Sequence, residues 1–109
     1  MKTTLMYTLQ DRTPVAEPNA SAWQAWMMAA QKDGSRIVSQ TRIDAHISVS
    51  TVFAGMGQGP AGSPGIDRPM VFESAVFEDG QVRETYVYAT WDEAQSGHAA
   101  LITALNAEA

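Results

Sequence analysis

The clearest pattern of apolar and polar positions lies in the last third of the chain. Met70 to Phe77 is an apolar run, Val82 to Tyr88 alternates between apolar and polar residues, and Asp79-Gly80 stands between the two segments. Gly and Asp tolerate the positive φ angles of a type I′ turn. The pattern therefore predicts a β-hairpin with a two-residue turn.

A helix is predicted directly after this hairpin. Thr90 and Glu93 have the spacing of a capping box, in which both side chains satisfy backbone N–H groups at the start of a helix. Gly97 lies in the middle of the predicted helix, where its missing Cβ would permit close approach of another backbone. The apolar positions then recur at helical spacing. The predicted stripe contains Trp91, Ala94, His98, Leu101, Ile102 and Leu105.

The two faces of the C-terminal hairpin are expected to differ. With the turn at Asp79-Gly80, Glu73 lies opposite Tyr86. The more apolar face, which we expect to meet the core, contains Met70, Phe72, Ser74, Val76, Thr85, Val87 and Ala89. The face of Glu73 mixes carboxylates with aromatic groups, which indicates a surface that another molecule covers.

The first half of the chain predicts a short strand and a helix. The strand covers Thr4 to Leu9. Asn19 and Ser21 compete as the cap of the helix, and Gly34 supplies a left-handed residue at its end. The helix has apolar side chains at helical spacing. These are Trp23, Trp26, Met27 and Ala30.

A second hairpin is predicted in the middle of the chain. Its strands are Arg36 to Arg42 and His46 to Phe53, joined by a three-residue turn at Ile43 to Ala45. This turn places Ser39 opposite Val49 and Thr41 opposite Ile47. The opposite face contains Val38, Gln40, Arg42, His46, Ser48 and Ser50.

The segment from Gly55 to Pro69 predicts a loop. It contains five Gly and three Pro, a composition that cannot form a regular element and costs much backbone entropy to order. We therefore expect one α+β domain over residues 1–109. Its antiparallel sheet of four to five strands packs against two amphipathic helices.

Composition excludes several kinds of protein. A net charge of −5 argues against a nucleic-acid partner, because a phosphate backbone attracts a basic surface. The absence of Cys excludes disulfides and thiolate chemistry, and fits a reducing compartment. The sequence contains no apolar stretch of about 20 residues, the length needed to span a bilayer. The expected location is therefore the cytoplasm, without a membrane partner.

Candidate binding residues come from three regions, and each has a structural alternative. His98 is either a ligand-binding imidazole or a buried side chain hydrogen-bonded to a backbone carbonyl. Glu73 and Tyr86 form the mixed hairpin face, where Glu73 is alternatively an edge residue with its carboxylate in water. Arg68 belongs to the Gly/Pro-rich loop, which we expect to contribute to the contact surface.

Hydroxyl groups are concentrated in the middle hairpin. Ser48 and Ser50 share its polar face, and Ser39 and Thr41 lie on the other. Such a surface can hydrogen-bond a sugar or a nucleotide, although polar filling of a solvent-facing sheet has the same pattern. We predict no catalytic residue, no metal site and no cofactor. The three Trp residues have core spacing.

Three ordered segments resemble one family of small proteins. They are Val49-Ser50-Thr51-Val52-Phe53, Pro69-Met70-Val71-Phe72-Glu73-Ser74 with Val76-Phe77, and Tyr88-Ala89-Thr90-Trp91-Asp92-Glu93-Ala94 with Gly97-His98. This order resembles a family encoded by phages and prophages, with STVF, FE(T/S)xxF and YxTWxEAxxGH motifs. Members of that family often have an Asp-His pair after the first motif, where this chain has Gly57-Gln58. The resemblance implies a viral accessory gene that acts in a bacterial cytoplasm.

These observations predict a non-enzymatic accessory protein of a phage or prophage. It would bind a host protein or a small molecule, in host takeover or counter-defence, and form a homo-dimer or higher homo-oligomer through the mixed face. One alternative is a small enzyme or nucleotide-like ligand binder that uses His98 and Glu73. The other is a structural component of the virion.

Overall fold

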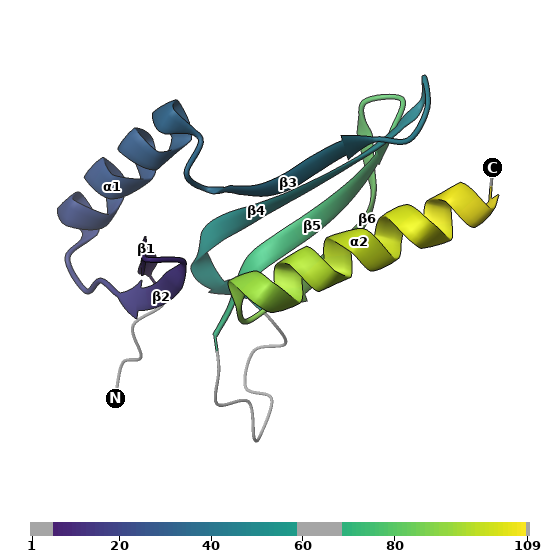
Figure 1. Cartoon of the computed structure of the whole chain (residues 1–109). Helices are drawn as coiled ribbons and strands as arrows, with labels where there is room; N and C mark the ends of the chain where they lie inside the picture. The colour runs from purple at the N-terminus through teal and green to yellow at the C-terminus, as the bar shows by residue number, and fades with distance from the viewer. Residues whose placement is uncertain (1–5, 59–68, 109) are drawn as a thin grey trace.

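The chain forms two antiparallel sheets and two helices (Figure 1). The computed structural model describes residues 6–58 and 69–108. Within these ranges, the larger sheet has the strand order β3-β4-β5-β6, and β1 and β2 form a separate hairpin. This arrangement confirms the expected α+β class. The elements are β1 (Tyr7–Gln10), β2 (Thr13–Ala16), α1 (Ala20–Asp33), β3 (Ile37–Arg42), β4 (Ile47–Gln58), β5 (Met70–Glu78), β6 (Gln81–Tyr88) and α2 (Trp91–Glu108).

Local sequence signals explain where α2 begins and where the C-terminal hairpin turns. Asp79 and Gly80 have φ angles of 54° and 82°, as a type I′ turn requires. The Thr90 hydroxyl oxygen accepts a hydrogen bond from the Glu93 N–H at 3.0 Å, and the Glu93 carboxylate accepts one from the Ala89 N–H at 3.2 Å. Both predictions are therefore confirmed, with the Glu93 side chain reaching one residue further back than in a standard capping box.

Helix α1 begins at the earlier of the two predicted caps. The Asn19 side chain accepts a hydrogen bond from the Ala22 N–H at 2.9 Å, so Ser21 lies inside the helix. Gly34 ends the helix with a φ of 79°, in the left-handed region, as predicted.

The β1–β2 hairpin was not predicted as a hairpin. Its strands pair from Tyr7↔Ala16 to Gln10↔Thr13, which leaves Asp11 and Arg12 as a two-residue turn. Both turn residues are left-handed, with φ angles of 51° and 68°. A sequence without Gly or Asn at this turn does not indicate such a conformation, which explains why only the first strand was expected. Part of the predicted first strand, from Thr4, lies outside the described residues.

The middle hairpin has a longer turn than predicted. Thr41 pairs with Val49 and Ser39 with Thr51, which is two residues away from the expected register. The Asp44 carboxylate stabilises the turn by accepting hydrogen bonds from the His46 and Ile47 N–H groups at 2.7 and 2.8 Å. A shift of two residues keeps Ser39, Thr41, Gln40 and Arg42 on their predicted faces. A bulge between Ile37 and Ser39 reverses the start of β3: Ile37 pairs with Val52, and Val38, which was expected on the polar face, packs against the core.

A β-bulge changes the faces of the C-terminal hairpin. Phe77 pairs with Val82 as predicted, but the register then shifts, and Ser74 instead of Glu73 lies opposite Tyr86. The extra residue on β6 moves its side chains to the other face. The predicted Glu73–Tyr86 pair is therefore wrong: Glu73 pairs with Val87.

Helix α2 covers one face of the larger sheet, and α1 lies beyond one end of that sheet (Figure 1). The expected sheet packed against two helices is therefore confirmed, with α1 meeting the sheet at its end, where Trp26 packs against Phe53. Four aromatic rings pack edge to face in sequence, with centroids 5.7, 5.3 and 6.1 Å apart, and connect the two helices through the core. The rings are those of Trp26, Phe53, Phe72 and Trp91.

Candidate functional site

The sequence-predicted binding residues occupy three separate places. Ser48, Ser50 and Glu73 share the sheet face opposite α2, because they alternate with the buried Val49, Thr51 and Ser74. Arg68 lies outside the described residues. Tyr86 lies on the α2 side of the edge strand β6, where its hydroxyl donates to a Glu84 carboxylate oxygen at 2.7 Å. The mixed face that combined Glu73 with Tyr86 does not exist, and self-association stays a prediction.

His98 lies between α2 and the sheet with both ring nitrogens hydrogen-bonded. Its Nε2 is 2.9 Å from the Thr41 hydroxyl, and its Nδ1 is 2.7 Å from the Thr51 hydroxyl. The Thr51 hydroxyl also contacts the Ser74 hydroxyl at 2.5 Å. Thr51 and Ser74 are fully buried, and His98 is 4% exposed. The partners are hydroxyl groups, in place of the backbone carbonyl that the sequence analysis expected.

We call the Thr41, Thr51 and Ser74 hydroxyls around His98 the hydroxyl cluster, and a neutral imidazole satisfies its hydrogen bonds. One ring nitrogen donates a hydrogen bond and the other accepts one, and each hydroxyl can take the complementary role. Burial lowers the pKa of His98 below its ordinary value, because desolvation disfavours the imidazolium. Neither nitrogen is left to bind a ligand, so His98 here connects α2 with β3, β4 and β5.

We expect the folded protein to lose stability between pH 7 and pH 5. In the unfolded chain the imidazole has a pKa of about 6.5, so below that pH the unfolded state binds a proton that folded His98 binds less readily. The free energy of unfolding should fall as pH falls through this window. Urea unfolding at pH 7, 6 and 5 should show a smaller pH dependence for His98→Asn than for wild type.

The other histidine provides the control for this experiment. His46 is exposed, and its hydrogen bond to Asp79 at 2.7 Å raises its pKa. Its contribution has the opposite sign: it is present at low pH and fades as pH rises through the raised pKa. His46→Asn should therefore not reduce the loss at low pH. An unchanged pH dependence in His98→Asn would show that His98 does not cause it.

The uncovered face of the sheet is hollowed near Ser48 and Ser50. A depression of about 470 Å³ lies over β3, β4 and β5, with Arg42 and Phe77 in its lining. Several of its polar side chains already have partners in the protein. Gln40 donates to the Ser50 hydroxyl at 3.1 Å, and Arg42 donates to the Ala45 carbonyl at 2.9 Å. These contacts reduce the hydrogen-bonding capacity available to a ligand.

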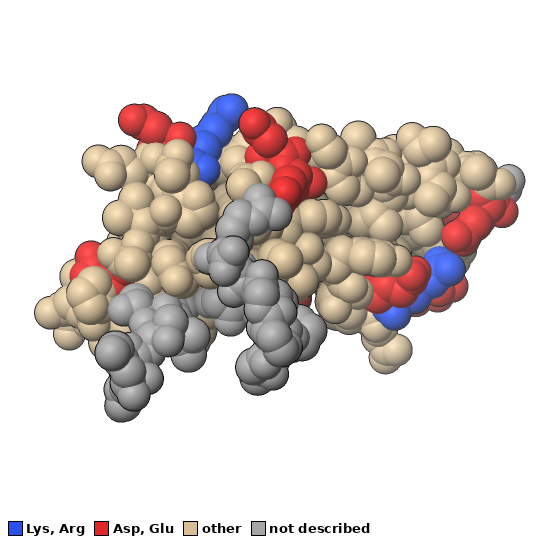
Figure 2. Space-filling view, turned by 90° about the horizontal axis from the view of Figure 1, so that it is seen from below, with Lys and Arg blue, Asp and Glu red and all other residues tan. Residues whose placement is uncertain are grey.

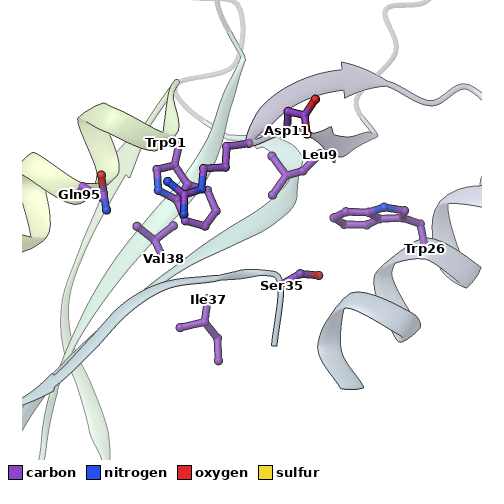
Figure 3. Close-up of a pocket in the computed structure, with 9 residues that line it drawn as sticks. Leu9, Asp11, Trp26, Ser35, Ile37, Val38, Trp91 and Gln95 are labelled. Carbon is purple, nitrogen blue, oxygen red and sulfur yellow. The ribbon is translucent and has the colours of Figure 1, made fainter. Parts of the chain in front are cut away.

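A larger cleft lies where the β1–β2 turn, α1, the start of β3 and α2 meet (Figure 3). Its volume is about 520 Å³. We call it the tryptophan cleft, because indole rings from both helices contribute to its walls. The lining residues are Leu9, Asp11, Arg12, Trp26, Ser35, Ile37, Val38, Trp91 and Gln95.

Arg12 and Trp91 are the central polar and aromatic groups of the tryptophan cleft. The Arg12 guanidinium lies over the Trp91 ring, 4.8 Å from its centroid, at cation–π distance. The indole N–H of Trp91 is buried and has no acceptor within the described ranges. Buried N–H groups normally have an acceptor, so this donor marks the cleft as an unusual part of the structure.

The sequence pattern did not indicate the tryptophan cleft, because it placed all Trp residues in the core. That assignment is partly correct, since Trp26 and Trp91 pack against Phe53 and Phe72. The same two indoles also form walls of the cleft. Asp11 and Arg12, the charged residues of the β1–β2 turn, are the sequence signal that could have indicated this site. Their position in the cleft beside Trp91 depends on the fold.

No metal centre is apparent in the described part of the chain, which contains no cluster of three or more His, Asp or Glu side chains suited to a metal ion. No helix in that part is long and apolar enough to cross a membrane.

Figure 2 shows one face on which basic side chains lie close to acidic ones and most of the surface is uncharged.

The fold and the cleft define a small α+β protein with a ligand-sized concavity beside its sheet. Comparisons with protein-family models, with curated proteins and with solved structures find no match to this chain.

Proposed function

We propose that this chain is a non-enzymatic binding protein of phage or prophage origin that holds a small molecule in the tryptophan cleft. The viral origin rests on the three sequence motifs alone. The cleft is the observation that carries the binding function: it has the size of a ligand site, aromatic walls and a few polar groups. Ligand sites typically measure about 300–1,000 Å³ and have this kind of lining.

The walls of the cleft are held in place before any ligand binds. Trp26 packs on Phe53 and Trp91 packs on Phe72, and both phenylalanine side chains are fully buried. A site whose walls are fixed by the core loses little conformational entropy on binding. This supports a small-molecule ligand over a host protein.

The positions of His98 and Glu73 favour binding over catalysis. His98 projects from α2 onto the covered face of the sheet, whereas Glu73 lies on the opposite face, so the two side chains cannot act on one substrate. Both nitrogens of His98 are also engaged by threonine hydroxyls. The enzyme alternative that relied on this pair therefore has no shared site.

A thermal-shift screen of the purified chain with nucleotides, sugars and aromatic acids tests the proposed function. We expect at least one compound class to raise the melting temperature by several degrees, because binding to the folded state stabilises it by mass action. Ser35→Phe should abolish the shift, because Ser35 is an exposed residue of the lining and a phenyl ring there would fill the cleft.

Ser96→Phe is the matched control. Ser96 is also exposed, but it lies on α2 outside the cleft lining. This variant should keep the ligand-induced shift of the wild type. The proposal is wrong if no compound stabilises the protein, or if Ser35→Phe retains a full shift.

A further inference from the structure

The tryptophan cleft contains a cation, Arg12, that no acidic side chain among residues 6–58 and 69–108 pairs with. Arg36 donates to the Phe53 carbonyl at 3.0 Å, and Arg83 pairs with acidic side chains, including Glu108 at 3.4 Å. Arg12, by contrast, makes no hydrogen bond or salt bridge to any described residue, and its one recorded interaction is with the Trp91 ring. Arg12 is exposed, so its donors can reach solvent or a ligand, in a chain of net charge −5.

Asp11, the acidic residue next to Arg12 in sequence, makes no ion pair with it among the described contacts. Asp11 precedes Arg12 in the turn and belongs to the lining of the cleft. Figure 3 shows its carboxylate directed away from Trp91 and Trp26. The guanidinium is therefore available to an acidic group that enters the cleft.

The backbone at Arg12 is not the one that local stability would select. Arg12 has a φ of 68° in a two-residue hairpin turn, where Gly or Asn is strongly preferred. A side chain such as Arg is disfavoured in this region. What the residue adds at this position is a guanidinium over Trp91, which suggests that its role lies in the cleft.

We infer that the tryptophan cleft binds a planar organic anion, a flat ring carrying one acidic group, of about the size of a mononucleotide. This inference rests on the proposed function and names its ligand class. The guanidinium fork of Arg12 binds a carboxylate or a phosphate through two parallel hydrogen bonds. The ring lies against the aromatic and aliphatic walls, which include Trp26, Ile37 and Val38.

Isothermal titration calorimetry with four probes tests this inference. Adenosine 5′-monophosphate carries a ring and a phosphate, and indole-3-acetate carries a ring and a carboxylate. Adenosine lacks the acidic group, and inorganic phosphate lacks the ring. We expect at least one of the two ring acids to bind ten-fold or more tightly than both adenosine and inorganic phosphate, and the preferred acid distinguishes phosphate from carboxylate ligands.

Substitution of Arg12 connects the binding to the cleft. Arg12→Gln should reduce affinity for the ring acid at least ten-fold, to the level of adenosine, while Arg83→Gln at the far edge strand should leave it unchanged. Arg12→Gly should lose the same affinity without a large drop in melting temperature, because Gly accepts the left-handed backbone. This variant separates a binding role from a structural one.

The outcomes distinguish the ligand class from the function. If adenosine binds as tightly as the ring acids, or Arg12→Gln binds like wild type, the anion inference is wrong and small-molecule binding stands. If none of the four probes binds but another compound of the thermal-shift screen does so in a Ser35→Phe-sensitive way, the ligand class alone is again wrong. If the screen also fails, the proposed function fails with it.

Discussion

Replacement of His98 by Ala is expected to lower the free energy of unfolding by about 3–5 kcal/mol. Truncation of a large buried side chain leaves a cavity that costs about 2–5 kcal/mol. It also removes the imidazole partner of the Thr51 hydroxyl, which keeps Ser74, and of the half-buried Thr41 hydroxyl, and a lost hydrogen bond of this kind costs about 0.5–1.5 kcal/mol. Urea unfolding followed by circular dichroism measures the loss.

Two further variants show whether the hydrogen bonds or the volume of His98 matter. His98→Gln can still hydrogen-bond and should recover part of the lost stability. His46→Ala removes an exposed imidazole and should change stability by no more than about 0.5 kcal/mol. A His98→Ala variant that unfolds like the His46→Ala variant would show that the hydroxyl cluster contributes little to stability.

Gly97→Ala is expected to destabilise the protein by about 1–3 kcal/mol, although Ala is the better helix former. In a helix interior, Gly→Ala usually stabilises by roughly 0.5–1 kcal/mol. Here a Cβ on residue 97 would overlap the Tyr88 ring, whose Cζ and hydroxyl oxygen would lie 2.5 Å away. Overpacking of this kind outweighs helix propensity. Thermal unfolding measures the effect directly.

A double-mutant cycle tests the cause of this loss. In a Tyr88→Leu background the ring is absent, so Gly97→Ala should become neutral or stabilising. Ala99→Gly, at an exposed position of the same helix, reports the propensity effect alone. If Gly97→Ala stabilises the wild-type protein, the close contact between α2 and Tyr88 does not exist as described.

His98 and Gly97 also affect the shape of the tryptophan cleft. His98 and Gly97 set the height and rotation of α2 over the sheet, one through hydrogen bonds and the other through the close approach of Tyr88. Trp91 and Gln95 lie on the first turns of the same helix and line the cleft. Changes at His98 or Gly97 should therefore weaken ligand binding indirectly, together with stability, unlike substitutions of Arg12.

Gly97 shows how a correct local observation can lead to an incorrect contact. The sequence indicated that a Gly in the middle of α2 permits close approach, and close approach is what the structure has. The neighbour is the Tyr88 side chain and not another backbone. The identity of the neighbour depends on the β-bulge in β6, which places Tyr88 on the α2 side of the sheet.

The local elements of this protein follow from its sequence because each depends on residues a few positions apart. The Asp79-Gly80 turn, the Thr90–Glu93 cap and the Gly34 helix end are all interactions within a short segment. The α+β class follows from the order of these elements. The core positions Phe72, Ser74 and Val76 of β5 were also predicted, although Val71 from the other face of that strand is fully buried as well.

Features that join distant segments were decided only by the tertiary structure. A one-residue bulge leaves no mark in the apolar pattern, yet it separates Glu73 from Tyr86. The hydroxyl cluster joins Thr41, Thr51 and His98 from three elements. The tryptophan cleft depends on the same kind of assembly, because Arg12 meets Trp91 only when the β1–β2 hairpin packs beside α2. Such contacts depend on packing over the whole chain, and no window of sequence contains them.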